Sequence, residues 1–68
     1  MADSVFKKIQ VVGTSPESYA KATANAVAKV AKTEKNLSWF EVTELRGAIR
    51  DGQVHEYQVT LNVGAKLE

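Results

Sequence analysis

The sequence predicts an α+β fold in which one helix covers one face of a three-stranded antiparallel sheet. A strand pattern precedes one long helical pattern, two strand patterns follow it, and the pair Asp51-Gly52 joins the last two as a hairpin. The hairpin makes those two strands antiparallel, and the helix forms a crossover that allows the third strand to lie in the middle. The other face of such a sheet has no cover.

The chain of 68 residues has room for one domain, residues 1–68, with hydrophobic (44%) and charged (25%) contents typical of globular proteins. It has no cysteine, which excludes disulfides, and its one histidine does not supply the ligands of a zinc site. A domain of this size buries only about 60% of its unfolded surface. We therefore expect oligomerisation to supply further buried area.

Charge and hydropathy exclude two classes of partner. Nine Lys/Arg against eight Asp/Glu give a net charge of +1, which lacks the basic excess of a nucleic-acid-binding protein. Asp3 stands where a signal peptide has its basic region, and no segment approaches the roughly 20 apolar residues that span a bilayer. We expect a cytoplasmic protein that binds neither nucleic acid nor membrane.

The first strand is predicted over Val5–Val12, where β-branched residues partly alternate with polar ones. The helix is predicted over Pro16–Glu34. Either Ser15 is its N-cap, with proline at the first helical position, or Thr14 forms a capping box with Glu17.

Apolar or small residues recur along this helix at the spacing of one face, namely Tyr19, Thr23, Ala26, Val27 and Val30. Six alanines, at positions 20, 22, 24, 26, 28 and 31, make most of the remaining surface small. Two interpretations stay open. The alanines form a contact with a neighbouring subunit, or they are present because alanine is the best helix former.

The second strand is predicted over Leu37–Ile49, with a bend or bulge near Arg46-Gly47, and the third over Val54–Ala65. Between them, Arg50–Gln53 forms a type I′ turn. The third strand alternates cleanly, and its apolar row is expected to face the helix: Tyr57, Val59, Leu61 and Val63.

A two-residue turn fixes the register of the hairpin. It places Phe40 opposite Val63 and Val42 opposite Leu61 on the helix side, and Leu45 opposite Gln58. The outer face is then shared by the following residues: Trp39, Glu41, Thr43, Leu45, Gln58, Thr60 and Asn62.

The only tryptophan, Trp39, therefore points away from the core, and such an aromatic needs a cover from another subunit or a planar ligand. In this register Trp39 and Gln58 lie about 20 Å apart along the sheet. They are too far apart to bind one small ring together within a single chain. A joint site has to combine residues from different copies or requires strong bending of the sheet.

Catalytic constellations are missing. The single histidine, His55, has no partner serine and carboxylate at a suitable spacing, and strand parity sends Glu41 and Glu44 to opposite faces. We predict that the protein is not an enzyme. Asp51 and Glu56 flank His55, and one residue repeated around a threefold axis becomes three ligands, so ion binding stays open and unassigned.

Three segments together, VFKKIQVVGTSPES, LSWFEVTELRG and HEYQVTLNVGAKLE, resemble the dodecins, small flavin-binding proteins, in order and across almost the whole chain. The resemblance implies a β-α-β-β subunit whose sheet wraps around its helix, assembled as a hollow homododecamer. It implies that Trp39 stacks on the flavin ring where subunits meet, that Gln58 hydrogen-bonds the polar edge of the ring, and that Arg46 lies near the flavin.

The implied function is flavin storage or sequestration with quenching of the flavin's photochemistry. FMN is the favoured ligand, and riboflavin and FAD are the alternatives. Two departures from the family pattern concern Ser38, where many bacterial members have aspartate, and Ala65-Lys66, where an aromatic and an arginine are common. The second departure bears on the coenzyme A binding of some relatives. A structural, ion-binding or coenzyme A-binding shell is the alternative function, and a flavoenzyme is a third.

Overall fold

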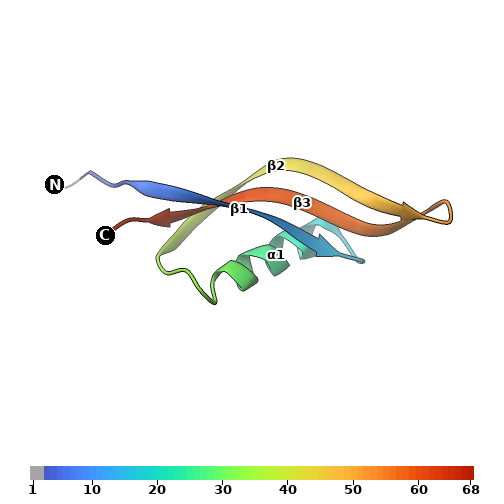
Figure 1. Ribbon diagram of the computed structural model, residues 1–68, viewed down its shortest axis with the longest axis horizontal. Helices are drawn as coiled ribbons and strands as arrows, with labels where there is room; N and C mark the ends of the chain where they lie inside the picture. Colours follow the sequence, from blue (N-terminus) through green and yellow to red (C-terminus); the bar gives the residue numbers. More distant parts are fainter. Residues whose placement is uncertain (1–2) are drawn as a thin grey trace.

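The computed structural model describes residues 3–68, which form a three-stranded antiparallel sheet arching over one helix (Figure 1). The elements in chain order are β1 (Phe6–Ser15), α1 (Tyr19–Val30), β2 (Leu37–Arg50) and β3 (Gln53–Lys66). The spatial order is β1-β3-β2, with both pairings antiparallel. This arrangement confirms the predicted α+β fold. We call the face toward α1 the inner face and the opposite face the outer face.

The helix begins three residues later than predicted. Ser18 is its N-cap, and the Ser18 side chain accepts a hydrogen bond from the Lys21 backbone N–H at 3.0 Å. Both predicted caps, at Ser15 and at Thr14, are wrong because β1 continues to Ser15 in its ladder with β3. The Ser15 hydroxyl instead accepts from the Glu17 N–H at 2.9 Å, which closes the turn before the helix.

The helix also ends earlier than predicted, at Val30 rather than Glu34. Ala31 is the C-cap, residues 31–33 form turns, and Asn36, with φ of 63°, redirects the chain in the left-handed region before β2. With 12 residues α1 is short. Within residues 3–68 no helix is long and apolar enough to cross a membrane.

The core lies between α1 and the middle of the sheet. Three helical residues spaced four apart, Ala22, Ala26 and Val30, are buried against the apolar row of β3. That row, predicted to face the helix, includes the most deeply buried large side chains of residues 3–68, Leu61, Val59 and Val63. The predicted helix stripe is right at Ala26 and Val30 but omits the fully buried Ala22. It is wrong at Tyr19, which is exposed and has its ring 5.0 Å from that of Tyr57.

The hairpin turn has the predicted geometry. Asp51 and Gly52 both have positive φ, 52° and 75°, and Arg50 pairs with Gln53. The register then shifts between Ala48 and Ile49, shifts again between Val42 and Glu44, and shifts a third time before Trp39. Each shift is an irregularity of the ladder, of the kind that bends a strand.

The first two shifts change which residues meet between them, because the first displaces the pairing by one residue from the register set by the turn and the second restores it. Phe40 pairs with Val63 and Val42 with Leu61, as predicted, but Leu45 pairs with Val59 and not with Gln58. Thr43 is the additional residue of β2 at the second shift. Because one extra residue reverses the alternation, Leu45 lies on the inner face and not on the outer face, where we expected it.

The helix packs against β1 and β3, and the inner face of β2 and of the hairpin extends beyond it (Figure 1). Large apolar side chains are exposed there: Phe40, Val42, Leu45, Ile49 and Val54. The chain measures 55 × 21 × 14 Å, and its radius of gyration of 14.1 Å exceeds the about 11 Å expected for its length. Its accessible surface, 5003 Å², likewise exceeds the about 4,200 Å² expected for its mass.

At Gly13, β1 approaches α1 closely. A Cβ there would collide with the Ala22 carbonyl oxygen and lie 2.8 Å from the Ala26 Cβ. We expect Gly13→Ala to separate helix and sheet, to destabilise the fold by about 1–3 kcal/mol and to lower the thermal unfolding midpoint. Gln10→Ala, at an exposed position of the same strand, is the control. Equal midpoints for Gly13→Ala and the wild type at one protein concentration would contradict this explanation.

Candidate functional site

Trp39 lies on the outer face, as predicted, and crosses the sheet. It pairs with Gly64 of β3, and its ring covers that glycine. The ring centroid lies 5.8 Å from that of Phe6 on β1, with the two planes tilted by 54°. The Trp39 side chain nevertheless remains 38% exposed. The sheet therefore supports the indole from below and at one end and leaves part of it accessible.

The rest of the outer face carries a row of polar pairs along β3. Asn62 Nδ2 donates to Glu41 Oε2 at 3.2 Å, and Thr60 Oγ1 donates to Glu44 Oε1 at 3.3 Å. Gln58 Nε2 donates to Glu56 Oε1 at 2.9 Å. Three carboxylates thus line one face.

Glu41 and Glu44 share the outer face, and the prediction that they lie on opposite faces is wrong. The extra residue Thr43 reverses the alternation between them. Each carboxylate also has a cationic neighbour, because Lys8 forms an ion pair with Glu41 and Arg46 Nη1 lies 4.0 Å from Glu44 Oε1. Both carboxylates are held in ion pairs and hydrogen bonds.

The Lys8 ammonium, which hydrogen-bonds the Glu41 carboxylate, holds the pKa of that carboxyl below its ordinary value of 4.5, and Asn62 adds to this effect. Because the pKa in the folded protein is the lower one, the ionised carboxylate favours the fold above pH 4.5. That contribution is lost as the pH falls through the pKa of the folded state. The Glu41 carboxyl is therefore charged at neutral pH, and Glu41 lies two residues from Trp39 along β2 on the same face.

The structure brings Arg46 and Gln58 together and leaves Trp39 apart from both. Arg46 pairs directly with Gln58 across β2 and β3, a pairing that the predicted register did not contain. Trp39 pairs with Gly64, six residues from Gln58 along β3, which corresponds to about 20 Å of extended strand. One chain therefore presents two separate groups on its outer face, an aromatic one and a polar one.

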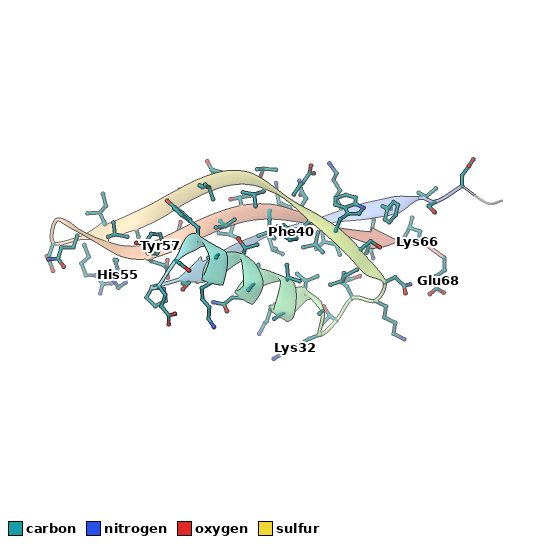
Figure 2. The ribbon with its side chains drawn as sticks, turned by 180° about the vertical axis from the view of Figure 1, so that it is seen from behind. Lys32, Phe40, His55, Tyr57, Lys66 and Glu68 are labelled. Atoms are coloured by element: carbon teal, nitrogen blue, oxygen red, sulfur yellow. The ribbon has the colours of Figure 1, made fainter. Side chains whose placement is uncertain are left out.

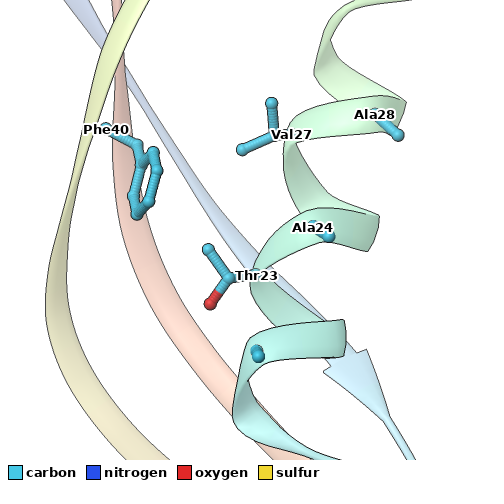
Figure 3. Close-up of a pocket in the computed structure, with 6 residues that line it drawn as sticks. Thr23, Ala24, Val27, Ala28 and Phe40 are labelled. Carbon is cyan, nitrogen blue, oxygen red and sulfur yellow. The ribbon is translucent and has the colours of Figure 1, made fainter.

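The inner face contains a groove that sequence reasoning missed. Phe40 of β2 and one flank of α1 line an open groove of about 600 Å³ (Figure 3). The helix contributes five residues to this lining: Ala20, Thr23, Ala24, Val27 and Ala28. The Thr23 hydroxyl donates a hydrogen bond to the Tyr19 carbonyl oxygen at 2.9 Å. Phe40 lies on this side of the sheet yet remains 52% exposed (Figure 2). The alanine spacing was the signal in the sequence, but only the structure shows what lies opposite it.

The residues considered for ion binding lie toward the hairpin turn, where His55 is exposed (Figure 2). Within residues 3–68, no three His, Cys, Asp or Glu side chains are grouped closely enough to hold a metal ion. Two positions were singled out because they depart from the pattern of the family that the sequence resembles. At the first, the Ser38 hydroxyl donates to the Asn36 carbonyl oxygen at 3.3 Å. At the second, Ala65 is buried and pairs with Lys7 and Leu37.

The fold and this surface define a class of small α+β protein, one with an exposed aromatic group on a polar sheet face and an open apolar groove behind it. The particular family is shown by sequence. The Dodecin family model matches residues 5–68, and the chain belongs to the dodecin family. This confirms the resemblance on which the sequence-based expectations of function depend.

Individual dodecins match this chain over almost its whole length. Dodecin of Thermus thermophilus is 50% identical over 64 residues, which cover 94% of this chain and 93% of the relative. The structure of dodecin from Streptomyces coelicolor matches with a TM-score of 0.94 at 46% identity, over 100% of this chain and 97% of that one. A calcium dodecin from Mycobacterium tuberculosis, with a calcium-binding site, matches with a TM-score of 0.82 at 32% identity, over 96% of this chain and 93% of that one.

The Lys8–Glu41 ion pair makes a pH-dependent prediction. Lys8→Met removes the ammonium, so we expect the Glu41 pKa to rise toward 4.5 in a carboxyl-carbon NMR titration. Lys7→Met is the matched control, because Lys7 pairs with Glu34 at 3.0 Å and not with Glu41. An unchanged Glu41 pKa in Lys8→Met would show that another group lowers it.

Proposed function

We propose that this protein stores or sequesters a flavin, which stacks on Trp39 where subunits of a homododecamer meet. FMN is the first candidate, with riboflavin and FAD as alternatives. Membership of the dodecin family supports a small, oligomeric, flavin-binding protein. The observation that carries the proposal is the partly exposed indole of Trp39, which lies across the sheet over Gly64 and beside Phe6.

The side chains supply suitable chemistry. An indole offers a flat apolar surface for an isoalloxazine ring. The Gln58 amide offers both a donor and an acceptor to the polar edge of that ring, and the neighbouring Arg46 guanidinium can pair with a phosphate or carbonyl oxygen. An excited flavin on Trp39 would take an electron from the indole and return it, so the excitation is lost without net chemistry. This is a binding role and not catalysis.

The distance between Trp39 and Gln58 within one chain supports a site that is shared between copies. Trp39 and Gln58 are about 20 Å apart within one chain, too far to contact one ring system together. A second copy has to bring its Gln58 and Arg46 to the Trp39 of the first. The excess surface and the exposed apolar residues of the inner face support such an assembly. We place this function in the cytoplasm.

The departures from the family pattern narrow the proposal. Ser38 provides no carboxylate beside Trp39, and its hydroxyl is directed to the Asn36 carbonyl oxygen. We therefore assign no proton-accepting role to position 38. Ala65 and Lys66 lack the aromatic and arginine side chains common in the family, so coenzyme A is not part of the proposed function.

Flavin binding is tested by titrating cofactor-free protein into FMN, riboflavin and FAD while following flavin fluorescence. We expect saturable quenching by the wild type and its loss in Trp39→Ala, because the stacking surface is removed. Tyr19→Ala is the matched control, since Tyr19 on α1 is 39% exposed, close to Trp39 at 38%.

Light scattering on the same samples distinguishes the outcomes. If flavin quenching is lost while the particle keeps its mass, Trp39 contacts the ligand. If Trp39→Ala dissociates the particle, Trp39 is a subunit anchor. Absence of quenching by the wild type with all three flavins would exclude flavin storage and leave the structural or ion-binding shell.

Assembly is tested at the groove. Phe40→Glu places a charge at the 52% exposed Phe40, and we expect it to reduce the particle mass, because burying an unpaired carboxylate is unfavourable. Val5→Glu is the control, since Val5 is 61% exposed but precedes β1 and does not line the groove. An unchanged mass for Phe40→Glu would show that the groove is not a subunit contact.

A further inference from the structure

We propose that Gly64 and Phe6 are the positioning residues of the Trp39 site. Gly64 provides the space in which the indole lies flat across β3, and Phe6 fixes the end of the indole that reaches β1. This inference deepens the proposed function and rests on it. Phe6, Trp39 and Gly64 belong to three different strands, β1, β2 and β3, and are far apart in sequence.

The contact at Gly64 is with the face of the indole and not with its edge. A Cβ built on Gly64 would lie less than 3.0 Å from three atoms of the six-membered ring, Cδ2, Cε2 and Cζ2. A point nearly equidistant from three atoms of one ring lies above the ring, near its centre. The ring is therefore stacked on the Gly64 backbone, and any side chain there would lift it by about 1 Å to reach ordinary van der Waals contact.

Gly64 differs in this respect from the other three glycines. An added Cβ at Gly13 or Gly47 would first meet backbone oxygens, of Ala22 and Glu56, and one at Gly52 would meet nothing within 4 Å. Gly52 has φ of +75°, as the turn requires, whereas no positive φ accounts for Gly64. The feature that accounts for a glycine at position 64 is the indole above it.

Phe6 acts from the opposite edge of the sheet. Phe6 of β1 pairs with Lys66 of β3, and β1 lies on the side of β3 opposite to β2. The Phe6 ring lies 5.8 Å from the Trp39 ring at a tilt of 54°. Trp39 thus extends from β2 over β3 to β1. The ring of Phe6 blocks further rotation of the indole in that direction. Phe6 is itself 38% exposed.

Together the two residues fix the height and direction of the stacking surface before any ligand arrives. One indole face is covered by the β3 backbone, which leaves the opposite face for a planar ligand. Preorganisation of this kind lowers the entropic cost of binding. Lifting or turning the indole would change the geometry of the stack without removing any atom of Trp39.

The test uses Trp39 as its own reporter, because it is the only tryptophan of the chain. In Gly64→Ala we expect stronger quenching of tryptophan fluorescence by acrylamide in the flavin-free protein, since the lifted ring is more accessible. We expect FMN affinity to fall about tenfold or more, because the stacking surface is displaced. Thr60→Ala, also on the outer face of β3, is expected to leave both measurements near their wild-type values.

Two variants of Phe6 keep the proposal testable if Gly64→Ala does not fold or assemble. Phe6→Leu removes the aromatic contact and is expected to raise indole accessibility and weaken FMN binding, whereas Phe6→Tyr keeps the ring and is expected to preserve both. A purely structural role would lower the thermal unfolding midpoint without changing acrylamide quenching in the folded protein.

The outcomes separate this inference from the proposed function. If the wild type binds no flavin, the proposed function fails, and the acrylamide measurement alone still decides whether Gly64 and Phe6 position the indole. If the wild type binds FMN and both Gly64→Ala and Phe6→Leu keep wild-type affinity and indole accessibility, the positioning roles are overturned.

Discussion

The unequal lengths of helix and strands determine most of this structure. A helix of 12 residues is about 18 Å long, whereas strands of 14 residues extend to about 46 Å. One helix cannot cover such a sheet, so α1 packs on β1 and β3 and leaves the inner face of β2 and of the hairpin exposed. The small core, the large surface and the groove beside Phe40 all follow from this mismatch.

One extra residue in β2 determines the chemistry of the outer face. Thr43 interrupts the ladder, and from Glu44 onward the alternation of β2 is reversed. Glu44 and Arg46 thereby join the outer face, where Arg46 pairs with Gln58. In an unbroken ladder Leu45 would have stood opposite Gln58, and an apolar side chain would have occupied the place of the guanidinium. The polar group of the candidate site therefore depends on this irregularity and on the shift between Ala48 and Ile49, which together displace the pairing by one residue between them.

The sequence predicted those features that nearby residues determine. The Asp51-Gly52 turn and the alternation of β3 follow from local patterns, and the register counted from the turn is right at Trp39 because the shift at Ala48/Ile49 and the shift at Val42/Glu44 offset each other. The start of α1 was misplaced because pairing with β3, which is distant in sequence, keeps Ser15 extended. The arrangement of Phe6, Trp39 and Gly64 could not be read locally, because it requires three strands in register.

Assembly and ligand binding are linked by the same geometry. The exposed inner face favours association of copies through burial of apolar surface, and the separation of Trp39 from Gln58 makes a shared site the only way to use both. A ligand that contacts both binds the assembly and not the separate chains, so its binding stabilises the assembly in proportion to the logarithm of its concentration. In the proposed function, the shell would accordingly be most stable when the flavin that it sequesters is abundant.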